Sequence, residues 1–267
     1  MTDRPLRSVL YVPADKPKAL AKIPTLPCDG VILDLEDAVA PGAKEAAREA
    51  LARTLPELDL GRRTVLIRVN GAGTPWHEAD LAAASALPCD GILLPKVGSG
   101  EEVPPGRFWA MIETPEGVLG APAIAARCDG LVMGTNDLAK ELGTQGRGAL
   151  TTALQSTVLA ARRSRTPVLD GVYNAFRDEA GLREECVQGR DWGFDGKTLI
   201  HPSQIEPANE IFAPSEEALE LARRQIEAFE AAGGGVAVLD GRIVENLHVE
   251  TARRLLAQAR AIAEMEG

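Results

Sequence analysis

Four acids and one arginine stand at or near the ends of short apolar runs in this 267-residue chain. The stretch CDGVILDLEDAV carries Glu36 and Asp37, and VLIRVN carries Arg68. AMIET and LVMGTND carry Glu113 and Asp137. Carboxylates brought together repel one another unless a cation shares the site. The pattern therefore predicts a charged site that includes a bound cation.

Glu113 and Asp137 are the best pair of metal ligands, because both follow strongly apolar runs that come one after the other. Carboxylate oxygens favour Mg²⁺ or Mn²⁺. Zinc is poorly supported, since the chain has 3 histidines and no paired histidine spacing. Asp137 has an alternative role as the cap of a helix that begins with LAKELG. Capping does not explain Glu113.

Arg68 follows three aliphatic residues and would be costly to leave unpaired beside a core. It either forms a salt bridge with Glu36 or Asp37 or grips a substrate carboxylate, and the two roles can coexist. Lys96 in LLPKV is a candidate Schiff-base lysine or phosphate contact, the former being disfavoured beside a metal. Asp34 is interior to its apolar run and is the weakest candidate of the three neighbouring acids.

The elements that must position these residues are eight short apolar runs separated by Ala-, Glu- and Arg-rich segments of helical character. Continuous apolar runs are typical of strands buried on both faces of a parallel sheet. The gap between the fourth and fifth runs leaves room for a vestigial helix only. The runs are residues 8–14, 30–37, 64–70, 91–97, 107–114, 130–137, 167–173 and 196–202.

Eight strand–helix units in one domain predict a (β/α)8 TIM barrel over residues 1–212, with chemistry at the carboxyl ends of the strands. A doubly wound open sheet is the main alternative, but no G-x-G-x-x-G follows the first strand and no P-loop occurs. Residues 213–267 predict a helix, a hairpin and a last helix. This C-terminal extension is expected to act as a lid or to mediate oligomerisation.

The tripeptide C/F-D-G recurs before four of the strands, beginning at Cys28, Cys89, Cys128 and Phe194. It predicts a turn into each strand, with glycine supplying an unusual backbone angle. The turns lie on the face of a barrel that serves stability. The four cysteines have no C-x-x-C spacing and are expected to be core thiols in a reducing compartment.

Composition excludes several classes of protein. The net charge of −10 and the lack of a basic tract disfavour a nucleic-acid binder. No run of about 18 apolar residues predicts a membrane-spanning helix. The N-terminus does not resemble a signal peptide, so the expected location is the cytoplasm.

Seven segments, in order, resemble the β subunit of citrate lyase and its relatives, the malyl-CoA, citramalyl-CoA and β-methylmalyl-CoA lyases of the HpcH/HpaI aldolase family. They are RSVLYVPADKPKAL, CDGVILDLEDAV, VLIRVNG, GILLPKV, MIETPEG, LVMGTNDLAKELG and GFDGKTLIHPSQIEPANEIFAPS, and the resemblance spans residues 7 to about 255. It implies a Mg²⁺-dependent TIM-barrel enzyme, usually a homotrimer or hexamer. Such enzymes cleave or form the C–C bond between a 2-oxo acid and the acetyl end of a CoA or acyl-carrier thioester.

The resemblance also implies roles for individual residues. Glu113 and Asp137 would hold Mg²⁺, and Arg68 would clamp the carboxylate of the oxo acid. Glu36 and Asp37 would orient metal-bound water and Arg68. Candidate contacts for the phosphates of the thioester cofactor, or for the charge network inside the site, are Arg7, Lys16 and Lys96.

The chain departs from the family at the lid. The family's lid motif resembles M-I-D-x-P, whereas this chain reads DGRIVENLH and places Glu245 where the lid aspartate would fall. Asp240 is a second candidate for that role. A displacement of about 1 Å can cost ~100-fold in rate, so we expect that the activity is shifted. The alternatives to a thioester C–C lyase are a CoA-independent 2-oxo-acid aldolase and a lyase subunit that is active only with a carrier-protein partner.

Overall fold

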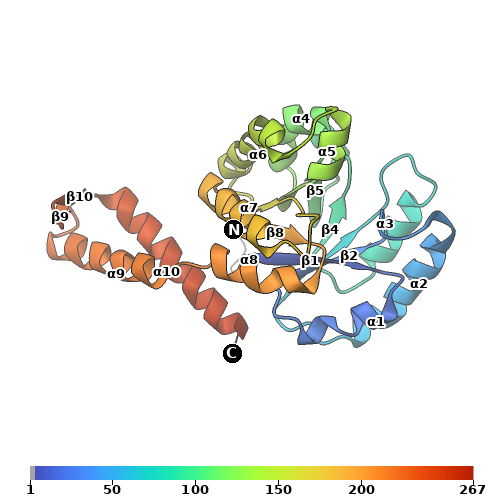
Figure 1. The fold of residues 1–267 in the computed structure, drawn as a ribbon, viewed down its shortest axis with the longest axis horizontal. Helices are drawn as coiled ribbons and strands as arrows, with labels where there is room; N and C mark the ends of the chain where they lie inside the picture. The colour runs from blue at the N-terminus through green and yellow to red at the C-terminus, as the bar shows by residue number, and fades with distance from the viewer. Residues whose placement is uncertain (1–3, 267) are drawn as a thin grey trace. The chain divides into compact units, whose positions relative to one another are not determined.

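Eight parallel strands form a closed barrel in the computed structural model of the chain, which describes residues 4–266 (Figure 1). The strands are β1 Ser8–Pro13, β2 Gly30–Asp34, β3 Thr64–Arg68, β4 Gly91–Leu94, β5 Phe108–Ile112, β6 Gly130–Met133, β7 Val168–Asp170 and β8 Gly196–Leu199. Each strand pairs with the next, and β8 closes the ring on β1, where Leu10 lies opposite Leu199. The predicted TIM barrel is confirmed.

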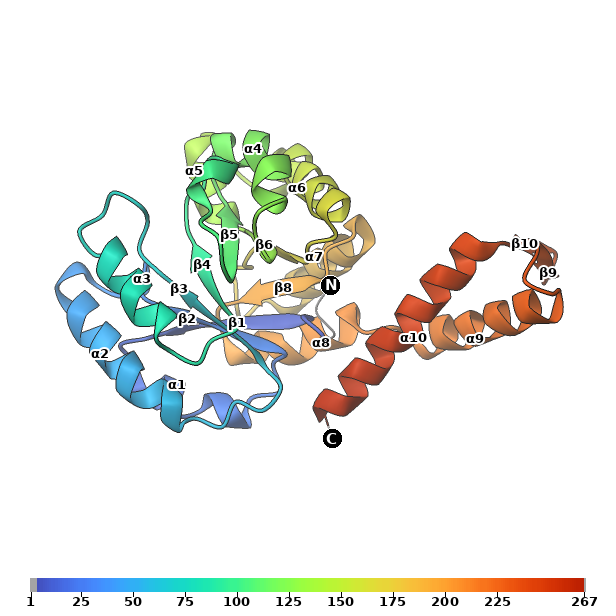
Figure 2. The same cartoon turned by 180° about the vertical axis from the view of Figure 1, so that it is seen from behind.

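Helices surround the strands on the outside of the barrel (Figure 2). They are α1 Pro17–Leu20, α2 Lys44–Thr54, α3 His77–Ser85, α4 Pro115–Ala125, α5 Thr135–Glu141, α6 Thr151–Ser164, α7 Glu179–Trp192 and α8 Ile205–Phe212. A single 3₁₀ turn, η4 Gly100–Glu102, stands between β4 and β5, as the short gap in the sequence predicts.

The core has two apolar layers, because strand side chains alternate between the two faces of the sheet. One layer fills the inside of the barrel and includes Ile32, Leu66, Leu93 and Trp109. The larger layer lies between the strands and the helices. Every residue of β2 and β3 is buried, which explains why these runs are continuously apolar in the sequence.

The repeated Asp-Gly turns place glycine at the first residue of β2, β4, β6 and β8. None of these four glycines is among those with positive φ, so the expected unusual backbone angle is wrong. Close packing requires them instead: a Cβ on Gly130 would lie 2.2 Å from Trp109, and one on Gly196 would lie 1.7 Å from the Leu6 carbonyl oxygen. The glycines of the repeat therefore allow close packing within the barrel.

Two of the repeated aspartates also hold the start of a neighbouring strand. Asp90 accepts a hydrogen bond from the backbone N–H of Val65 at 2.8 Å, and Asp195 accepts one from Val168 at 2.8 Å. The cysteines that precede these turns, together with Cys186, are free thiols, and Cys28, Cys89 and Cys186 are buried. Both observations fit a structural role for the repeat.

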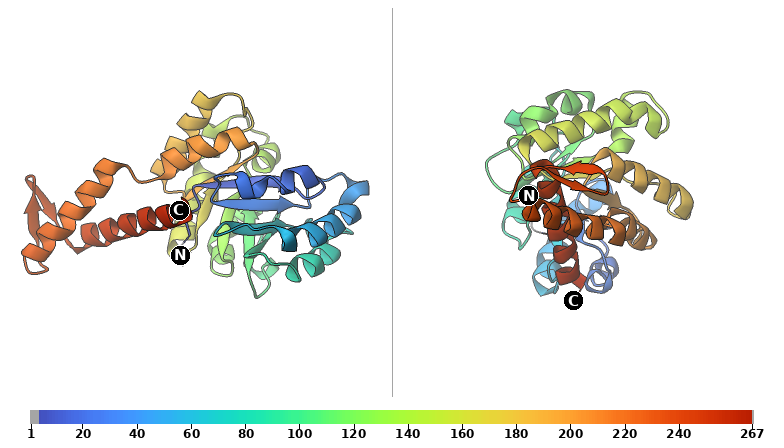
Figure 3. Two further views of the ribbon diagram at one scale, coloured as in Figure 1. Left: turned by 90° about the horizontal axis from the view of Figure 1, so that it is seen from below. Right: turned by 90° about the vertical axis from the view of Figure 1, so that its left-hand side faces the viewer.

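The chain divides into two compact units, with the boundary between Phe212 and Ala213; the second unit also includes Arg4 and Pro5. In the second unit, α9 Glu216–Ala231 packs on α10 Asn246–Glu266, and the hairpin β9 Ala237–Leu239 and β10 Arg242–Val244 connects them (Figure 3). Ala237, Val244 and Val249 form the small core of this unit. The predicted helix–hairpin–helix extension is confirmed. Within residues 4–266, no helix is long and apolar enough to cross a membrane.

Candidate active site

Asp34, at the end of β2, anchors the charged residues at the mouth of the barrel. Its carboxylate accepts hydrogen bonds from Arg68 Nε at 2.7 Å and Nη2 at 2.6 Å. It also accepts the backbone N–H groups of Glu36 and Ala38 at 2.9 and 3.1 Å. The sequence indicated that Asp34 is the weakest site candidate of the three neighbouring acids. These hydrogen bonds show instead that Asp34 has a part in the site. It fixes both the arginine and the loop that follows β2.

Arg68 is buried and directs its remaining nitrogen toward the other two acids. Nη1 lies 2.8 Å from Glu36 Oε2 and 3.8 Å from Asp37 Oδ2. The guanidinium also lies over the ring of Tyr11, with 4.9 Å between Cζ and the ring centroid. The salt bridge predicted with Glu36 is present. A grip on a substrate carboxylate stays a prediction.

Glu113 follows β5 and is 1% exposed. Its Oε1 accepts the backbone N–H of Lys96 at 2.8 Å, and a Cβ on Gly134 would lie 2.3 Å from its Oε2. Burial, followed by the charge of Glu36, raises the pKa of Glu113 to about 7. Lys96 adopts a left-handed φ of 54°, which is costly for a residue with a side chain and is typical of functional sites.

Asp137 lies on the first turn of α5, because β6 ends at Met133 and the helix begins at Thr135. The N-cap of α5 is Gly134 and no side chain caps it, so Asp137 is not the capping residue. The strand end predicted at residue 137 is therefore wrong by four residues. Its charge nevertheless raises the pKa of both Glu113 and Lys96, and its role as a metal ligand stays a prediction.

Lys96 shows that the four acids share one site. Burial acts to lower its pKa, yet the pKa lies above the usual range because nearby carboxylates outweigh burial. In decreasing order of effect, these carboxylates are Glu36, Asp137, Glu113 and Asp37. The Lys96 ammonium is 3.4 Å from Glu36 Oε1. The structure thus brings together the residues that the sequence predicted from the ends of separate strands.

The donor set at the mouth fits a hard divalent cation that keeps water or ligand oxygens. No group of three or more His, Cys, Asp and Glu residues between Arg4 and Glu266 could enclose a metal. Mg²⁺ needs fewer protein ligands than that, since one or two carboxylates commonly hold it with waters and substrate oxygens. Glu36 Oε2 is buried without a well-directed hydrogen bond, although Arg68 Nη1 is close. It remains an acceptor for a water of such an ion.

Two predicted cofactor contacts lie in different surroundings. Arg7 immediately precedes β1, at the opposite end of the barrel from the mouth, and is 3% exposed. Its Nε and Nη2 donate to Asp29 at 2.9 and 2.8 Å. The predicted contact of Arg7 with cofactor phosphates is wrong, because the side chain is buried and paired there. Lys16 follows β1 at the mouth and is exposed beside Asp15, so its contact stays a prediction.

Asp170, at the end of β7, does not face the mouth. Its carboxylate accepts hydrogen bonds from Arg147 and from the fully buried Lys197, which also pairs with Glu185 of α7. These contacts direct Asp170 into the layer between strands and helices. A position at the end of a strand is therefore not sufficient to place an acid in the site.

Glu245 and Asp240 belong to the second unit. Asp240 is paired with Arg224 at 2.8 Å and has a φ of 50° in the hairpin turn. The carboxylate of Glu245 is exposed, and no hydrogen bond or ion pair connects it to the described residues. Its role as the lid acid or base stays a prediction.

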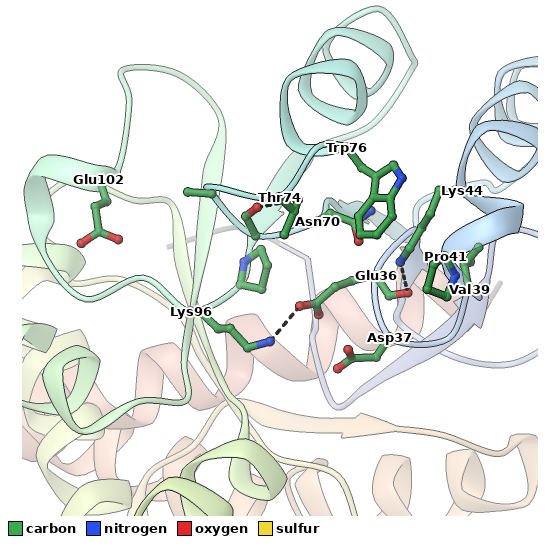
Figure 4. Close-up of a pocket in the computed structure, with 13 residues that line it drawn as sticks. Glu36, Asp37, Val39, Pro41, Lys44, Asn70, Thr74, Trp76, Lys96 and Glu102 are labelled. Atoms are coloured by element: carbon green, nitrogen blue, oxygen red, sulfur yellow. Dashed lines mark hydrogen bonds and ion pairs between the residues drawn. The ribbon is translucent and has the colours of Figure 1, made fainter.

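A pocket of about 450 Å³ opens beside the acids, where β2, β3 and β4 end (Figure 4). Glu36, Asp37 and Lys96 line its inner side, and Trp76 and Lys44 line the side formed by the loops after β3 and β2. The sequence pattern does not single out Asp34 as the anchor of Arg68. The barrel brings the two together, because Asp34 and Arg68 stand at the ends of consecutive strands and lie opposite each other in the register.

A parallel eight-stranded barrel that gathers acids, an arginine and a lysine at the carboxyl ends of its strands is the architecture of a TIM-barrel enzyme. The chain belongs to the HpcH/HpaI aldolase/citrate lyase family, whose model matches residues 7–105 and 106–202.

Among its relatives, a (3S)-malyl-CoA thioesterase of Cereibacter sphaeroides is 54% identical over 274 residues, covering 97% of this chain and 96% of the relative. An L-malyl-CoA/beta-methylmalyl-CoA lyase of the same species is 31% identical, with coverage of 97% and 96%. Protein CitE from Mycobacterium tuberculosis in complex with magnesium, acetoacetate and coenzyme A is 33% identical, with a TM-score of 0.84 and coverage of 97% and 100%. The family resemblance is confirmed, and the relatives include both lyases and thioesterases.

Proposed function

We propose that this chain is a magnesium-dependent hydrolase of a short 3-hydroxyacyl-CoA thioester of the malyl-CoA type. The observation that supports hydrolysis is the 54% identity with the thioesterase across 97% of the chain, against 31% with the malyl-CoA lyases. The altered lid sequence around Glu245 points the same way, since the lyase lid aspartate is replaced. Arg68 at the mouth of the barrel supports the CoA thioester of a dicarboxylic acid as substrate, since such a thioester has one free carboxylate.

Each charged residue has a task in this reaction. Glu113 and Asp137 would hold Mg²⁺, which supplies polarisation of the thioester carbonyl when bound. Arg68, whose Nε and Nη2 are held by Asp34, would bind the free carboxylate of the malyl group through Nη1, which also pairs with Glu36. Lys96 offsets the negative charge of the surrounding acids.

The hydrolytic step needs a base for water. Asp37 has an exposed side chain beside Arg68 and is the acid best able to reach solvent water. Water attacks the thioester carbonyl carbon while Asp37 takes its proton, and the C–S bond then breaks. The CoA sulfur leaves and accepts a proton, for which Glu245 is our candidate donor. The products are malate and free CoA.

A C–C lyase is the second candidate, because the malyl-CoA lyases and the CitE structure share this barrel and cover nearly the whole chain. In that reaction a base removes the proton of the substrate hydroxyl, and the products are glyoxylate and acetyl-CoA. Free thiol distinguishes the two reactions, since the lyase releases none.

The test is product analysis with (3S)-malyl-CoA and Mg²⁺. Hydrolysis yields one free thiol per substrate consumed, detected with a thiol reagent, and no glyoxylate. EDTA should abolish it. Stoichiometric glyoxylate without thiol would establish the lyase instead. Turnover of unesterified substrates alone would select the CoA-independent aldolase, and turnover with a carrier-protein thioester alone would select the partner-dependent subunit.

Assembly is also part of the proposal. We expect a homotrimer or hexamer in the cytoplasm, because the family resemblance implies these assemblies. Light scattering coupled to size-exclusion chromatography measures the mass directly. A monomer of 28.3 kDa would contradict the expectation.

A further inference from the structure

Lys44 is a buried ammonium that the reaction described above does not use. It is the first residue of α2 and is 5% exposed. No carboxylate within residues 4–266 lies at ion-pair distance from its Nζ. A cation at a helix N-terminus also faces the unfavourable end of the helix dipole. The position is therefore a costly one for a lysine.

The contacts of Lys44 are all with the loops that form the site. Nζ donates hydrogen bonds to the carbonyl oxygens of Leu35 at 2.8 Å and of Glu36 at 2.7 Å. It also lies 5.4 Å from the ring centroid of Trp76, in the loop between β3 and α3. Figure 4 shows Lys44 and Trp76 on the same side of the pocket, with the dashed bond reaching the loop of Glu36.

The two carbonyl groups stand where the chain leaves β2 and turns toward α2. The Glu36 carbonyl accepts the Val39 N–H at 2.9 Å as well, so it is the pivot of this turn. Asp34 holds the same turn from the other side through the N–H groups of Glu36 and Ala38. Lys44 thus donates to backbone carbonyl groups of this short segment, and Asp34 accepts from its backbone N–H groups.

A buried lysine without a carboxylate partner is a weak source of stability, because the cost of burying its charge opposes the gain from its hydrogen bonds. Burial lowers the pKa of Lys44, although the negative charges of Asp34 and Glu36 act to raise it. The lowered pKa reflects the cost of burying the ammonium group. Its contacts converge on the backbone that carries Glu36 and Asp37. The benefit that offsets the cost of burying the Lys44 ammonium therefore lies in the arrangement of the site.

We propose that Lys44 is a positioning residue for the reaction: through the carbonyl groups of Leu35 and Glu36 it holds the loop after β2 so that Glu36 pairs with Arg68 and Asp37 faces the bound substrate. Lys44 does not touch the substrate in this role. The proposal rests on the proposed thioester hydrolysis only because kcat and KM are measured with that reaction.

The test compares Lys44→Met, which keeps the length of the side chain and removes the donors and charge, with Lys22→Met. Lys22 is exposed and lies outside the site. We expect kcat of Lys44→Met to fall roughly tenfold or more, because small displacements of reacting groups are costly. KM should change much less, and Tm should stay equal or rise. Lys22→Met should match the wild type in all three.

Two further measurements separate positioning from a general structural role. Hydrogen exchange of the amides of residues 36–39 should accelerate in Lys44→Met while exchange in α7 stays unchanged. Activity of Lys44→Ala should rise in a saturable way when ethylamine is added, because the small amine can occupy the vacated position. Ethylamine should have no effect on Lys22→Ala.

A fall in Tm that accounts for the lost activity, with faster exchange throughout the barrel, would overturn the proposal. An unchanged kcat or unchanged exchange at residues 36–39 would also overturn it. The exchange measurement needs no substrate. It therefore tests Lys44 even if the wild-type enzyme proves to be a lyase, whereas product analysis alone decides the proposed function.

Discussion

The surroundings of Glu113 raise the pKa of its carboxyl group. The carboxylate lies between the Lys96 N–H and Gly134, away from water, and its pKa rises to about 7. A cation beside this carboxylate would offset both the cost of its burial and the repulsion from Glu36. The left-handed backbone of Lys96 is what directs its N–H at this acid.

Removing either proposed ligand should weaken metal binding strongly without unfolding the barrel. In Glu113→Gln and Asp137→Asn, Mg²⁺ affinity measured by calorimetry should fall roughly 100-fold or more, since even outer ligand partners contribute 10–100-fold. Glu116 lies three residues further on, is exposed, and offers a matched control as Glu116→Gln. Unchanged affinity in both site variants would show that the metal is held elsewhere.

Asp34 should matter for stability as well as for activity. In Asp34→Asn the buried Arg68 loses its charged bidentate partner, and breaking such a pair costs about 3 kcal/mol or more in free energy of unfolding. Urea denaturation measures this loss. Asp37→Asn, at an exposed acid of the same loop, should change stability by less than about 0.5 kcal/mol. Equal effects of the two substitutions would refute the anchoring role of Asp34.

At the scale of the elements, the even-numbered strands of the barrel begin with glycines that leave room for a neighbour. Gly91 and Gly130 both face Trp109 of β5, whose indole lies inside the barrel. The large side chain fills the space that the two glycines leave. Contacts between adjacent strands thus explain the glycines of the Asp-Gly repeat.

Gly130→Ala should therefore destabilise the barrel. Its new Cβ would meet the Trp109 ring at 2.2 Å, and overpacking of this kind costs typically about 1–3 kcal/mol. Thermal unfolding should show a lower Tm. Gly148→Ala is the control, because a Cβ there has no neighbour within 4 Å. A wild-type Tm for Gly130→Ala would mean that the ring moves aside freely.

At the scale of the whole molecule, the chain combines a barrel that holds the charged mouth with a second unit that carries Glu245. The hairpin of that unit has Ala237 and Val244 in its core, while Val238 and Ile243 on the opposite face are exposed. Glu245 follows directly on β10, at the start of α10. Its carboxylate is exposed.

Substitution of Glu245 tests whether the second unit takes part in the reaction. Glu245→Gln should lower kcat by about 100-fold, the lower limit for loss of a general acid or base. Its Tm should not change, because the carboxylate is exposed. Asp240→Asn, which breaks the exposed pair with Arg224, should keep the activity. The reverse result would assign the lid role to Asp240, and two active variants would exclude this hairpin from catalysis.

The barrel could be predicted from the amino-acid sequence, because strands buried on both faces require continuous apolar runs with helices between them. The sequence also predicted which acids share a site, since the carboxyl ends of parallel strands meet at one mouth. Glu36, Glu113 and Asp137 are examples, and all three act to raise the pKa of Lys96.

The partner of each charged residue could not be predicted in this way. Asp34 rather than Asp37 holds Arg68, Asp170 turns to the helices, and Arg7 lies at the far end of the barrel. The sequence does not show which face of a strand a side chain takes, or how far a strand extends before a helix begins. Those details depend on register and packing between segments distant in the chain, and they place the buried Lys44 behind the acids.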